Sequence, residues 1–271
     1  MIGFIGLGQM GAPMASRLAA WPDGLIVYDV RPEATQPLIG KGARPAASIE
    51  EVARAASLIC LMVRDDGQVA EVVSAIAAAP APESRIIAIH STIQAETAPA
   101  LAARYASQQI QILDAPVSGG FMGAKDGRLA VMVGGPREAF ERCRPPFGHF
   151  ADLVLHLGPV GAGTQAKLAR NLLHFVSFTA AFEAQRLAEA AGIDWRKLAK
   201  VVRHSDAPDH PRPAAAADRP AHRPGPRRCG RDPDRRRAED RRAGRRSAPR
   251  DRDLPHPLRW LAGRRQAQHA G

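Results

Sequence analysis

The chain has 271 residues, which is enough for one large domain or two smaller ones with a buried core. Its net charge of +11 is concentrated at one end of the chain. Residues 1–203 carry 20 Lys or Arg and 18 Asp or Glu, whereas residues 204–271 carry 18 Arg and 9 Asp or Glu. The first part therefore lacks the excess of positive charge that is typical of a protein that binds nucleic acid. The three cysteines lack the spacing of disulfides or metal ligands. The N-terminus has no basic leader, and no apolar run approaches about 18 residues. These features predict a cytoplasmic protein with no metal site and no membrane partner.

The first predicted elements are a short buried strand, a glycine-rich turn and a helix, within residues 2–20 (IGFIGLGQMGAPMASRLAA). Gly6 suits a tight turn, Gly8 the close approach of a pyrophosphate to the backbone, and Gly11 the close packing of the helix on the strand. The helix N-terminus then presents free N–H groups and the positive end of its dipole to the phosphates. We therefore predict that this turn binds a dinucleotide, through Gly6, Leu7, Gly8, Gln9, Met10 and Gly11.

A second strand, within LIVYDVRPE, ends in an acid that bears on the choice of dinucleotide. Asp29 follows Gly11 by 18 residues, near the spacing expected for the carboxylate that accepts hydrogen bonds from the ribose hydroxyls. A carboxylate here repels a 2′-phosphate and favours NAD. Arg31 can soften that preference, or it can be an ordinary solvated loop residue. The expected cofactor is NAD, with NADP possible.

Further apolar runs of strand length alternate with helical segments. Strands are expected at residues 56–63 and 85–92 and within IQILDAPVS, separated by the helical QVAEVVSAIAAA and an Ala-rich segment at 96–106. This alternation predicts an α/β fold of the Rossmann type, with a doubly wound parallel sheet buried on both faces. Because ligands bind beyond the carboxyl ends of such strands, the turns MVRDD, HSTI and DAPVSGG should line one crevice. Met62 and Val63, in the first of these turns, are candidate cofactor-binding residues.

The next segments carry candidate substrate-binding and catalytic residues. The turn of Ser118, Gly119 and Gly120 can present a hydroxyl and successive N–H groups to a carboxylate, or it can simply lead into the next helix. A long helix is expected to begin after Gly163, with Lys167 and Asn171 four residues apart on one face. Its apolar residues are expected to belong to the core; they are Leu168, Leu172, Phe175, Phe178 and Phe182.

Four segments resemble the β-hydroxyacid dehydrogenases, which include 3-hydroxyisobutyrate dehydrogenase and tartronate semialdehyde reductase and are related to 6-phosphogluconate dehydrogenase. The segments are GFIGLGQMGAPMA, HSTI, DAPVSGGFMGAKDGRLAVMVGG and GPVGAGTQAKLARN, in the family's order and spacing. The resemblance covers residues 1–207, and residues 208–271 do not match. It implies an oxidoreductase that transfers a hydride between NAD(P) and a small 3-hydroxy acid. It also implies a dinucleotide-binding domain over residues 1–162, the start of an all-α domain over residues 163–203, and homo-oligomers for the intact family.

The same resemblance implies roles for single residues. Lys167 matches the general acid/base of the family, and Asn171 matches the residue that helps to hold the substrate. Arg170 stands where many members have Asn, which places a cation beside the catalytic face. The remaining matches are Thr92, beside the nicotinamide, and the substrate-anchoring turn of Ser118, Gly119 and Gly120.

Residues 204–271 form a low-complexity tail rich in Arg and Pro. From His204 to Asp253 there is no Val, Ile, Leu, Met, Phe, Trp or Tyr. Ordering these residues, at about 1.5 kcal/mol each, is therefore not offset by burial, and we expect disorder. Three interpretations compete: a natural extension, a nucleic-acid-binding segment built on Arg clusters, and a frameshift in GC-rich DNA. We favour the frameshift, because the family match ends without a linker. If the second domain is missing, the alternative function is a truncated NAD(P)-binding module with little or no catalysis.

Overall fold

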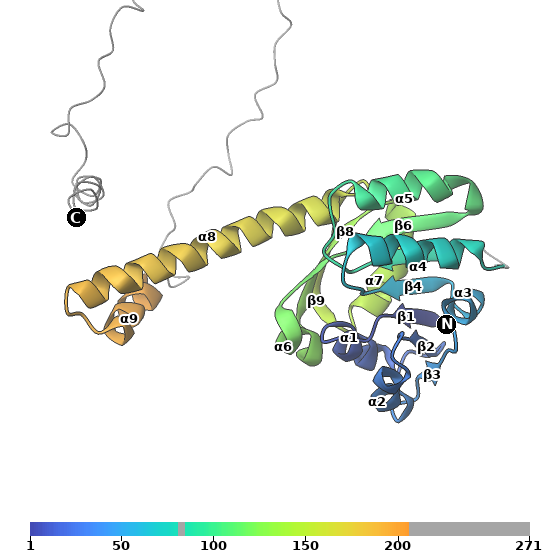
Figure 1. Cartoon of the computed structure of the whole chain (residues 1–271), viewed down its shortest axis with the longest axis horizontal. Helices are drawn as coiled ribbons and strands as arrows, with labels where there is room; N and C mark the ends of the chain where they lie inside the picture. The colour runs from blue at the N-terminus through green and yellow to red at the C-terminus, as the bar shows by residue number, and fades with distance from the viewer. Residues whose placement is uncertain (81–84, 206–271) are drawn as a thin grey trace, which may run out of the picture. The chain divides into compact units, whose positions relative to one another are not determined.

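The structure, a computed structural model, describes residues 1–80 and 85–205 (Figure 1). Residues 1–204 form one compact unit. The expectations for the tail of residues 204–271 lie outside the described residues except at His204 and Ser205, where the expected disorder is wrong because both residues belong to a helix. None of the described helices combines the length and the apolar character that crossing a membrane requires.

The described part of the backbone forms a sheet of nine strands in the order β3-β2-β1-β4-β5-β6-β8-β7, with β9 paired to β8. The first six strands in the chain are parallel, which is the Rossmann arrangement that the alternation of apolar runs and helices predicted. The strands are β1 (Ile2–Ile5), β2 (Leu25–Tyr28), β3 (Arg44–Pro45), β4 (Leu58–Leu61), β5 (Arg85–Ile89), β6 (Ile110–Asp114), β7 (Val117–Ser118), β8 (Leu129–Gly134) and β9 (Ala151–Gly158).

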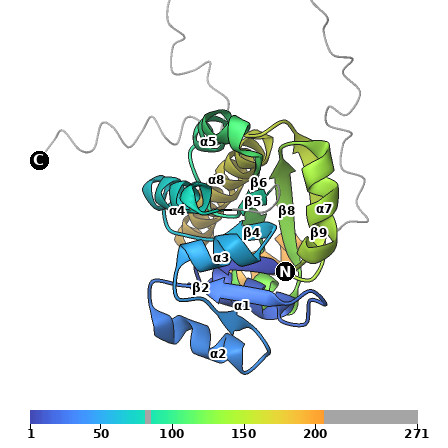
Figure 2. The same ribbon diagram turned by 90° about the vertical axis from the view of Figure 1, so that its right-hand side faces the viewer.

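Helices cover both faces of the parallel strands (Figure 2). The α-helices are α1 (Gly11–Leu18), α2 (Gln36–Ile39), α3 (Ile49–Ala55), α4 (Asp66–Ala78), α5 (Thr97–Tyr105), α6 (Gly120–Asp126), α7 (Arg137–Phe147), α8 (Ala162–Ala190) and α9 (Trp195–Ser205), and two short 3-10 helices are η1 (Pro32–Thr35) and η2 (Ala106–Gln108).

The core consists of two layers, one on each face of the sheet. Phe4 of β1 packs with α1, α6 and α7, whereas its neighbour Ile5 packs with α3, α4 and α5. Cys60 and Ile59 of β4 divide in the same way. Successive side chains of a strand point to opposite faces, so strands with both faces covered must be apolar at every position. This explains why the strand segments read as unbroken apolar runs.

The sheet continues beyond the predicted parallel strands. β8 runs antiparallel to β6 and β7, and β9 runs parallel to β8. The sequence prediction did not include β8 or β9. The extension matters for the site, because the first turns of α8 pack on β6, β8 and β9.

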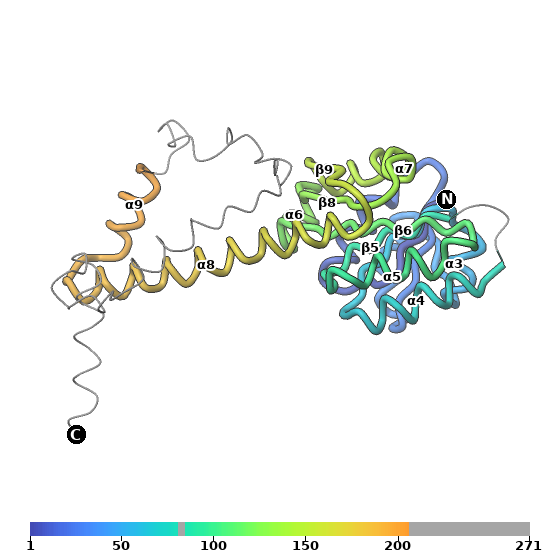
Figure 3. The backbone as a smooth tube through the Cα atoms, turned by 90° about the horizontal axis from the view of Figure 1, so that it is seen from above, coloured from blue at the N-terminus to red at the C-terminus, as the bar shows by residue number. Residues whose placement is uncertain are grey.

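Helix α8 leads away from these strands and is followed by α9 (Figure 3). It begins at Ala162, two residues earlier than predicted, and it is buried at Gly163 and Thr164 and again at Ala188. The expectation that its apolar residues belong to the core is wrong for the described residues: Leu168, Leu172, Phe175, Phe178 and Phe182 are 42–66% exposed. Once α8 has passed the sheet, the described residues leave its apolar face largely uncovered.

Candidate functional site

The parallel strands deliver the predicted site residues to one edge of the sheet. Beyond the strand ends the hydrogen-bond ladder continues for one more residue: the N–H groups of Gly6, Met62, His90 and Ala115 donate to the carbonyls of Tyr28, Ile5, Leu61 and Ile89, at 2.8–2.9 Å. Met62 and His90 open two of the three turns that the sequence placed around a crevice, Ala115 lies in the third, and Gly6 begins the glycine turn. The turns are therefore anchored by backbone hydrogen bonds at a common edge.

The three glycines of the first turn have different steric surroundings. Gly6 has a φ of +93°, and a Cβ atom there would lie 2.2 Å from the Met62 carbonyl oxygen. A Cβ atom on Gly11 would lie 1.9 Å from the Gly6 carbonyl oxygen, so the start of α1 is pressed against the turn. Gly8 is exposed and has no atom within 4 Å of its Cβ position. No side chain caps α1, and its first turn holds no acid, which leaves the positive end of the helix open to an anion.

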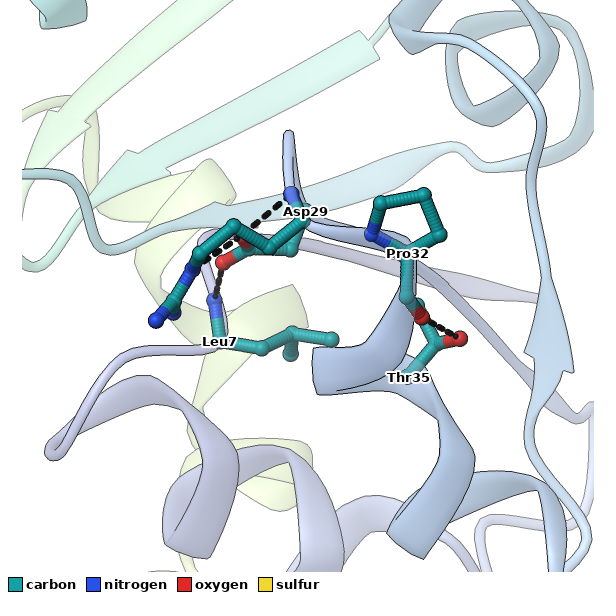
Figure 4. A network of polar contacts seen from close by, with 5 residues as sticks. Leu7, Asp29, Pro32 and Thr35 are labelled. Carbon is teal, nitrogen blue, oxygen red and sulfur yellow. Dashed lines mark hydrogen bonds and ion pairs between the residues drawn. The ribbon is translucent and has the colours of Figure 1, made fainter.

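Asp29 joins the end of β2 to this turn (Figure 4). Its carboxylate accepts a hydrogen bond from the Leu7 N–H at 2.7 Å and one from the Arg31 N–H at 2.9 Å. The exposed guanidinium of Arg31 adds an ion pair, with Nε 3.2 Å from Asp29 Oδ1. Partial burial alone would raise the pKa of Asp29, but the N–H donors and the Arg31 cation outweigh it and lower the pKa. The carboxylate is therefore ionised and oriented.

The turns after β4 and β5 are tied together by a serine that the sequence analysis did not single out. The Ser91 hydroxyl accepts from the Val63 N–H at 2.9 Å and donates to the Val63 carbonyl at 2.8 Å. Asp66 adds a second connection, because its carboxylate accepts from the N–H of Gln94 at 2.9 Å. These bonds hold Met62 and Val63, both half-buried, close to the exposed Thr92. Ser91 lies inside the segment HSTI, but nothing in the sequence distinguished it as buried.

The structure brings Lys167 to the strand that carries Ser118. The Lys167 Nζ atom donates to the Val117 carbonyl at 2.7 Å. Burial lowers the pKa of Lys167, and the cation of Arg170 lowers it further. Gly119 and Gly120 are exposed and have φ values of +130° and +65°, and α6 begins at Gly120. The turn thus both leads into a helix and leaves its backbone accessible.

Asn171 lies one turn beyond Lys167 and is half-buried, without a polar contact in the described part of the chain. Its place on the face of Lys167 follows from the spacing of four residues, as the sequence analysis assumed. Of the two candidate catalytic residues, only Lys167 is therefore fixed by a hydrogen bond.

Two buried ionisable residues at this edge were not recognised as functional candidates from the sequence. His90 is fully buried among aromatic rings, and its own ring makes one hydrogen bond, between Nδ1 and the Ala115 carbonyl at 2.8 Å. Burial lowers its pKa to about 4, against the smaller opposing effect of that bond, so the ring is neutral. Asp114 is also fully buried and accepts two backbone hydrogen bonds from the start of α8. A buried acid at a strand end was the available sequence signal.

The candidate site does not coincide with a cavity of about 940 Å³ that lies along α1, α2 and α6. That cavity is lined by Arg17, Lys41, Lys125 and His149 among others, and by none of the predicted site residues. No cluster of three His, Cys, Asp or Glu side chains suited to a metal ion occurs in residues 1–80 and 85–205.

Comparisons with known proteins relate the chain to NAD-binding oxidoreductases. Residues 1–158 match the family model of the NAD binding domain of 6-phosphogluconate dehydrogenase. The chain is 55% identical over 207 residues to an uncharacterized oxidoreductase of Mycobacterium tuberculosis, covering 76% of this chain and 70% of that one. It is 34% identical to 3-hydroxyisobutyrate dehydrogenase of Pseudomonas aeruginosa, covering 75% and 69%. A solved structure of M. tuberculosis 3-hydroxyisobutyrate dehydrogenase with L-serine superposes with a TM-score of 0.71 at 33% identity, covering 76% and 70%.

Proposed function

The chain belongs to the β-hydroxyacid dehydrogenases, a family of NAD(P)-binding oxidoreductases, and from that premise we propose that it transfers a hydride between NAD and a small 3-hydroxy acid, with Lys167 as general acid/base. The observation that carries the proposal is the contact of Lys167 with Val117, which places an ammonium of lowered pKa beside the Ser118 turn. An amine at this position can exchange a proton with a substrate that the turn holds.

The residues of the first turn fit a dinucleotide. Gly8 is exposed and offers free space where a pyrophosphate would approach the backbone, and the uncapped N-terminus of α1 favours its negative charge. The ionised carboxylate of Asp29 is suited to accept hydrogen bonds from the ribose hydroxyls. Met62, Val63 and Thr92 would flank the nicotinamide end. When bound, the nicotinamide supplies the acceptor or donor of the hydride.

Asp29 supports NAD as the preferred cofactor. A 2′-phosphate would meet an ionised carboxylate whose pKa is lowered, and the resulting repulsion disfavours NADP. Arg31 is paired with that same carboxylate, so its guanidinium is partly neutralised in the state that the structure describes. An Arg31 side chain released from Asp29 would lessen the discrimination, and this side chain is 58% exposed.

The proton chemistry falls to Lys167. In the direction of reduction, its ammonium donates a proton to the forming alkoxide and stabilises the negative charge there. In the direction of oxidation, the neutral amine accepts the proton of the substrate hydroxyl. Burial and Arg170 both favour the neutral form, which a lysine needs for this second task. One of the three donor positions of the ammonium is used by Val117, which leaves others for the substrate.

The groups around Lys167 support the proposed substrate class. The hydroxyl of Ser118 and the N–H groups of Gly119 and Gly120 are suited to a carboxylate, and Asn171 can add an amide contact on the same side of α8. Holding the carboxylate at the turn fixes the carbinol carbon relative to Lys167, which contributes by positioning. The relatives support the class by name, since one is 3-hydroxyisobutyrate dehydrogenase and one has been solved with L-serine, itself a 3-hydroxy acid.

The test is to add 3-hydroxyisobutyrate, L-serine or a longer 3-hydroxy acid with NAD and to follow NADH by absorbance. Lys167→Ala should lower kcat by about 10²–10⁴-fold and leave the Kd for NAD unchanged, because its contacts are on the substrate side. Lys200→Ala, which removes an exposed helical lysine, serves as the matched control. Normal turnover by Lys167→Ala, or an equal loss in the control, would contradict the proposal.

A second candidate is favoured by the exposed apolar face of α8. If this face has no packing partner, the protein is an NAD(P)-binding module with little catalysis. Measuring NAD binding and turnover in the same preparation separates the two candidates. Ordinary turnover refutes the module, whereas tight NAD binding without turnover of any 3-hydroxy acid refutes the dehydrogenase.

A further inference from the structure

We propose that Asp114 is a positioning residue for Lys167, because its buried carboxylate fastens the first turn of α8 to the end of β6 and so sets where the lysine stands. The Gly161 N–H donates to Asp114 Oδ1 at 2.6 Å, and the Thr164 N–H donates to Oδ2 at 2.6 Å. The acid and its donors are 47 and 50 residues apart in the chain. This role rests on the proposed function of Lys167.

Asp114 acts as the cap that α8 does not supply for itself. The residue at the N-cap position is Gly161, which has a φ of +98° and no side chain to accept a hydrogen bond. The N–H groups of a first helical turn have no partner within the helix, and a negative charge near them is favourable. Both carboxylate oxygens are used, one by each N–H. An amide offers only one oxygen, so Asn at this position must leave one N–H facing an NH₂ group.

At the contact of Asp114 with the start of α8, here called the joint, the backbones of helix and strands approach too closely to leave room for side chains between them. A Cβ atom on Gly134 of β8 would lie 2.4 Å from Asp114 Oδ1, and one on Gly163 of α8 would lie 2.3 Å from the Met132 carbonyl oxygen. Helix backbone and strand backbone are therefore in direct contact here. Such packing resists sliding of the helix along the strands, because any displacement must break the two short bonds to Asp114.

The same two segments meet again one turn further along α8. Lys167 follows Thr164 by three residues, and Val117, whose carbonyl receives the Lys167 Nζ, follows Asp114 by three residues. A slip of α8 by a single residue is about 1.5 Å, and an error of about 1 Å in a catalytic geometry can cost on the order of 100-fold in rate. Asp114 thus fixes the register of α8, and the register determines whether Lys167 reaches the Ser118 turn.

The first arm of the test compares Asp114→Asn with Ser48→Ala. Ser48 caps α3 through the Glu51 N–H, and α3 lies apart from α8 (Figures 1 and 3), so its loss lowers stability without touching the joint. Asp114→Asn should lower kcat about 10–100-fold with the Kd for NAD within about twofold, whereas Ser48→Ala should keep the kcat of the parent chain. A similar kcat loss in both variants, or none in Asp114→Asn, overturns the proposal.

The second arm does not depend on turnover. Lysine side chains are labelled with acetic anhydride over a range of pH, and Lys167 is compared by mass spectrometry with the exposed Lys200 as an internal reference. In the parent chain the lowered pKa of Lys167 should make it reactive at lower pH than an ordinary lysine, and Asp114→Asn should reduce this difference while Ser48→Ala does not. If this shift occurs in a chain without dehydrogenase activity, the positioning role stands and the proposed function fails. An unchanged labelling profile overturns the positioning role.

If Asp114→Asn does not fold, Asp114→Glu takes its place, since it keeps the charge but moves the oxygens by one methylene. The same losses are expected, and a Glu variant with parental kcat and parental labelling overturns the proposal. Hydrogen exchange on the parent chain is the final check. The amides of Gly161 and Thr164 should be protected, and exchange at the rate of open amides would show that the joint does not hold.

Discussion

The glycine turn allows cofactor binding and folding to be separated by two single-methyl substitutions. In Gly11→Ala, the added carbon would lie 1.9 Å from the Gly6 carbonyl oxygen, so the start of α1 must move by more than 1 Å. Overpacking of this kind costs about 1–3 kcal/mol. For a unit of this size each kcal/mol lowers Tm by about 2–4 °C, which predicts a loss of roughly 2–12 °C without cofactor.

Gly8→Ala adds the same methyl where no atom lies within 4 Å, so its stability without cofactor should change by less than about 0.5 kcal/mol. The methyl instead occupies the space that a pyrophosphate needs near the backbone. We expect the Kd for NAD to rise at least tenfold, which is about 1.4 kcal/mol. At an NAD concentration of about 100 times the parental Kd, stabilisation by the ligand then falls from about 2.7 to about 1.4 kcal/mol.

The assay is thermal unfolding of the parent and both variants, with and without NAD, together with calorimetric titration of NAD. Gly8→Ala should melt like the parent without NAD and show about half its NAD-induced increase in Tm. Gly11→Ala should melt early in both conditions. Parental affinity in Gly8→Ala would refute the reasoning about the pyrophosphate, and a parental Tm in Gly11→Ala would refute the steric reasoning.

Three other predictions concern charge. Arg170→Asn should raise the pKa of Lys167, because it removes one of the two causes that lower this pKa. In the oxidation direction, kcat/KM should then begin to rise at a higher pH than in the parent chain. An unchanged pH profile would contradict this prediction. Asp29→Ala should weaken the binding of NAD by about 1.5–3 kcal/mol and the binding of NADP by less, as measured by the two Kd values. An equal loss of affinity for both cofactors would contradict the assigned preference for NAD. Burial holds the pKa of His90 near 4, whereas a histidine in the unfolded chain titrates near 6.5. As the pH is lowered, the unfolded state therefore takes up a proton before the folded state does. The free energy of unfolding should fall between pH 6.5 and pH 4 by up to about 3 kcal/mol. Urea unfolding at several pH values should show this slope in the parent chain and a smaller slope in His90→Gln.

Much of the cofactor half of the protein was predictable because its signals are local. The strand Ile2–Ile5 is apolar at every position since both faces are covered, and that pattern is visible in the sequence. The glycines of the first turn are required by contacts within a few residues, such as the approach of Gly11 to Gly6. Asp29 was recognised from its distance along the chain, which a strand–turn–helix–turn–strand unit nearly fixes.

The strand β9 was missed for a different reason. β9 (ADLVLHLG) alternates between exposed and partly covered positions, with Leu153, Leu155 and Leu157 on the exposed side. Leucines on an exposed face hide the alternation of apolar and polar residues by which such a strand is normally recognised. The burial of α8 was misjudged similarly, since an apolar helical face indicates that a partner is needed but does not show whether the partner is present.

The α/β framework, the glycine turn with Asp29 at the following strand end, and the family of residues 1–207 were readable from the sequence, because periodicity, glycine sterics and motif spacing are properties of neighbouring residues. Only the tertiary structure decided that Ser91 ties two turns together, that Asp114 caps α8, and that Lys167 reaches the Val117 carbonyl. Those contacts join residues 28–50 positions apart, and their geometry exists only after the sheet has brought its strand ends to one edge.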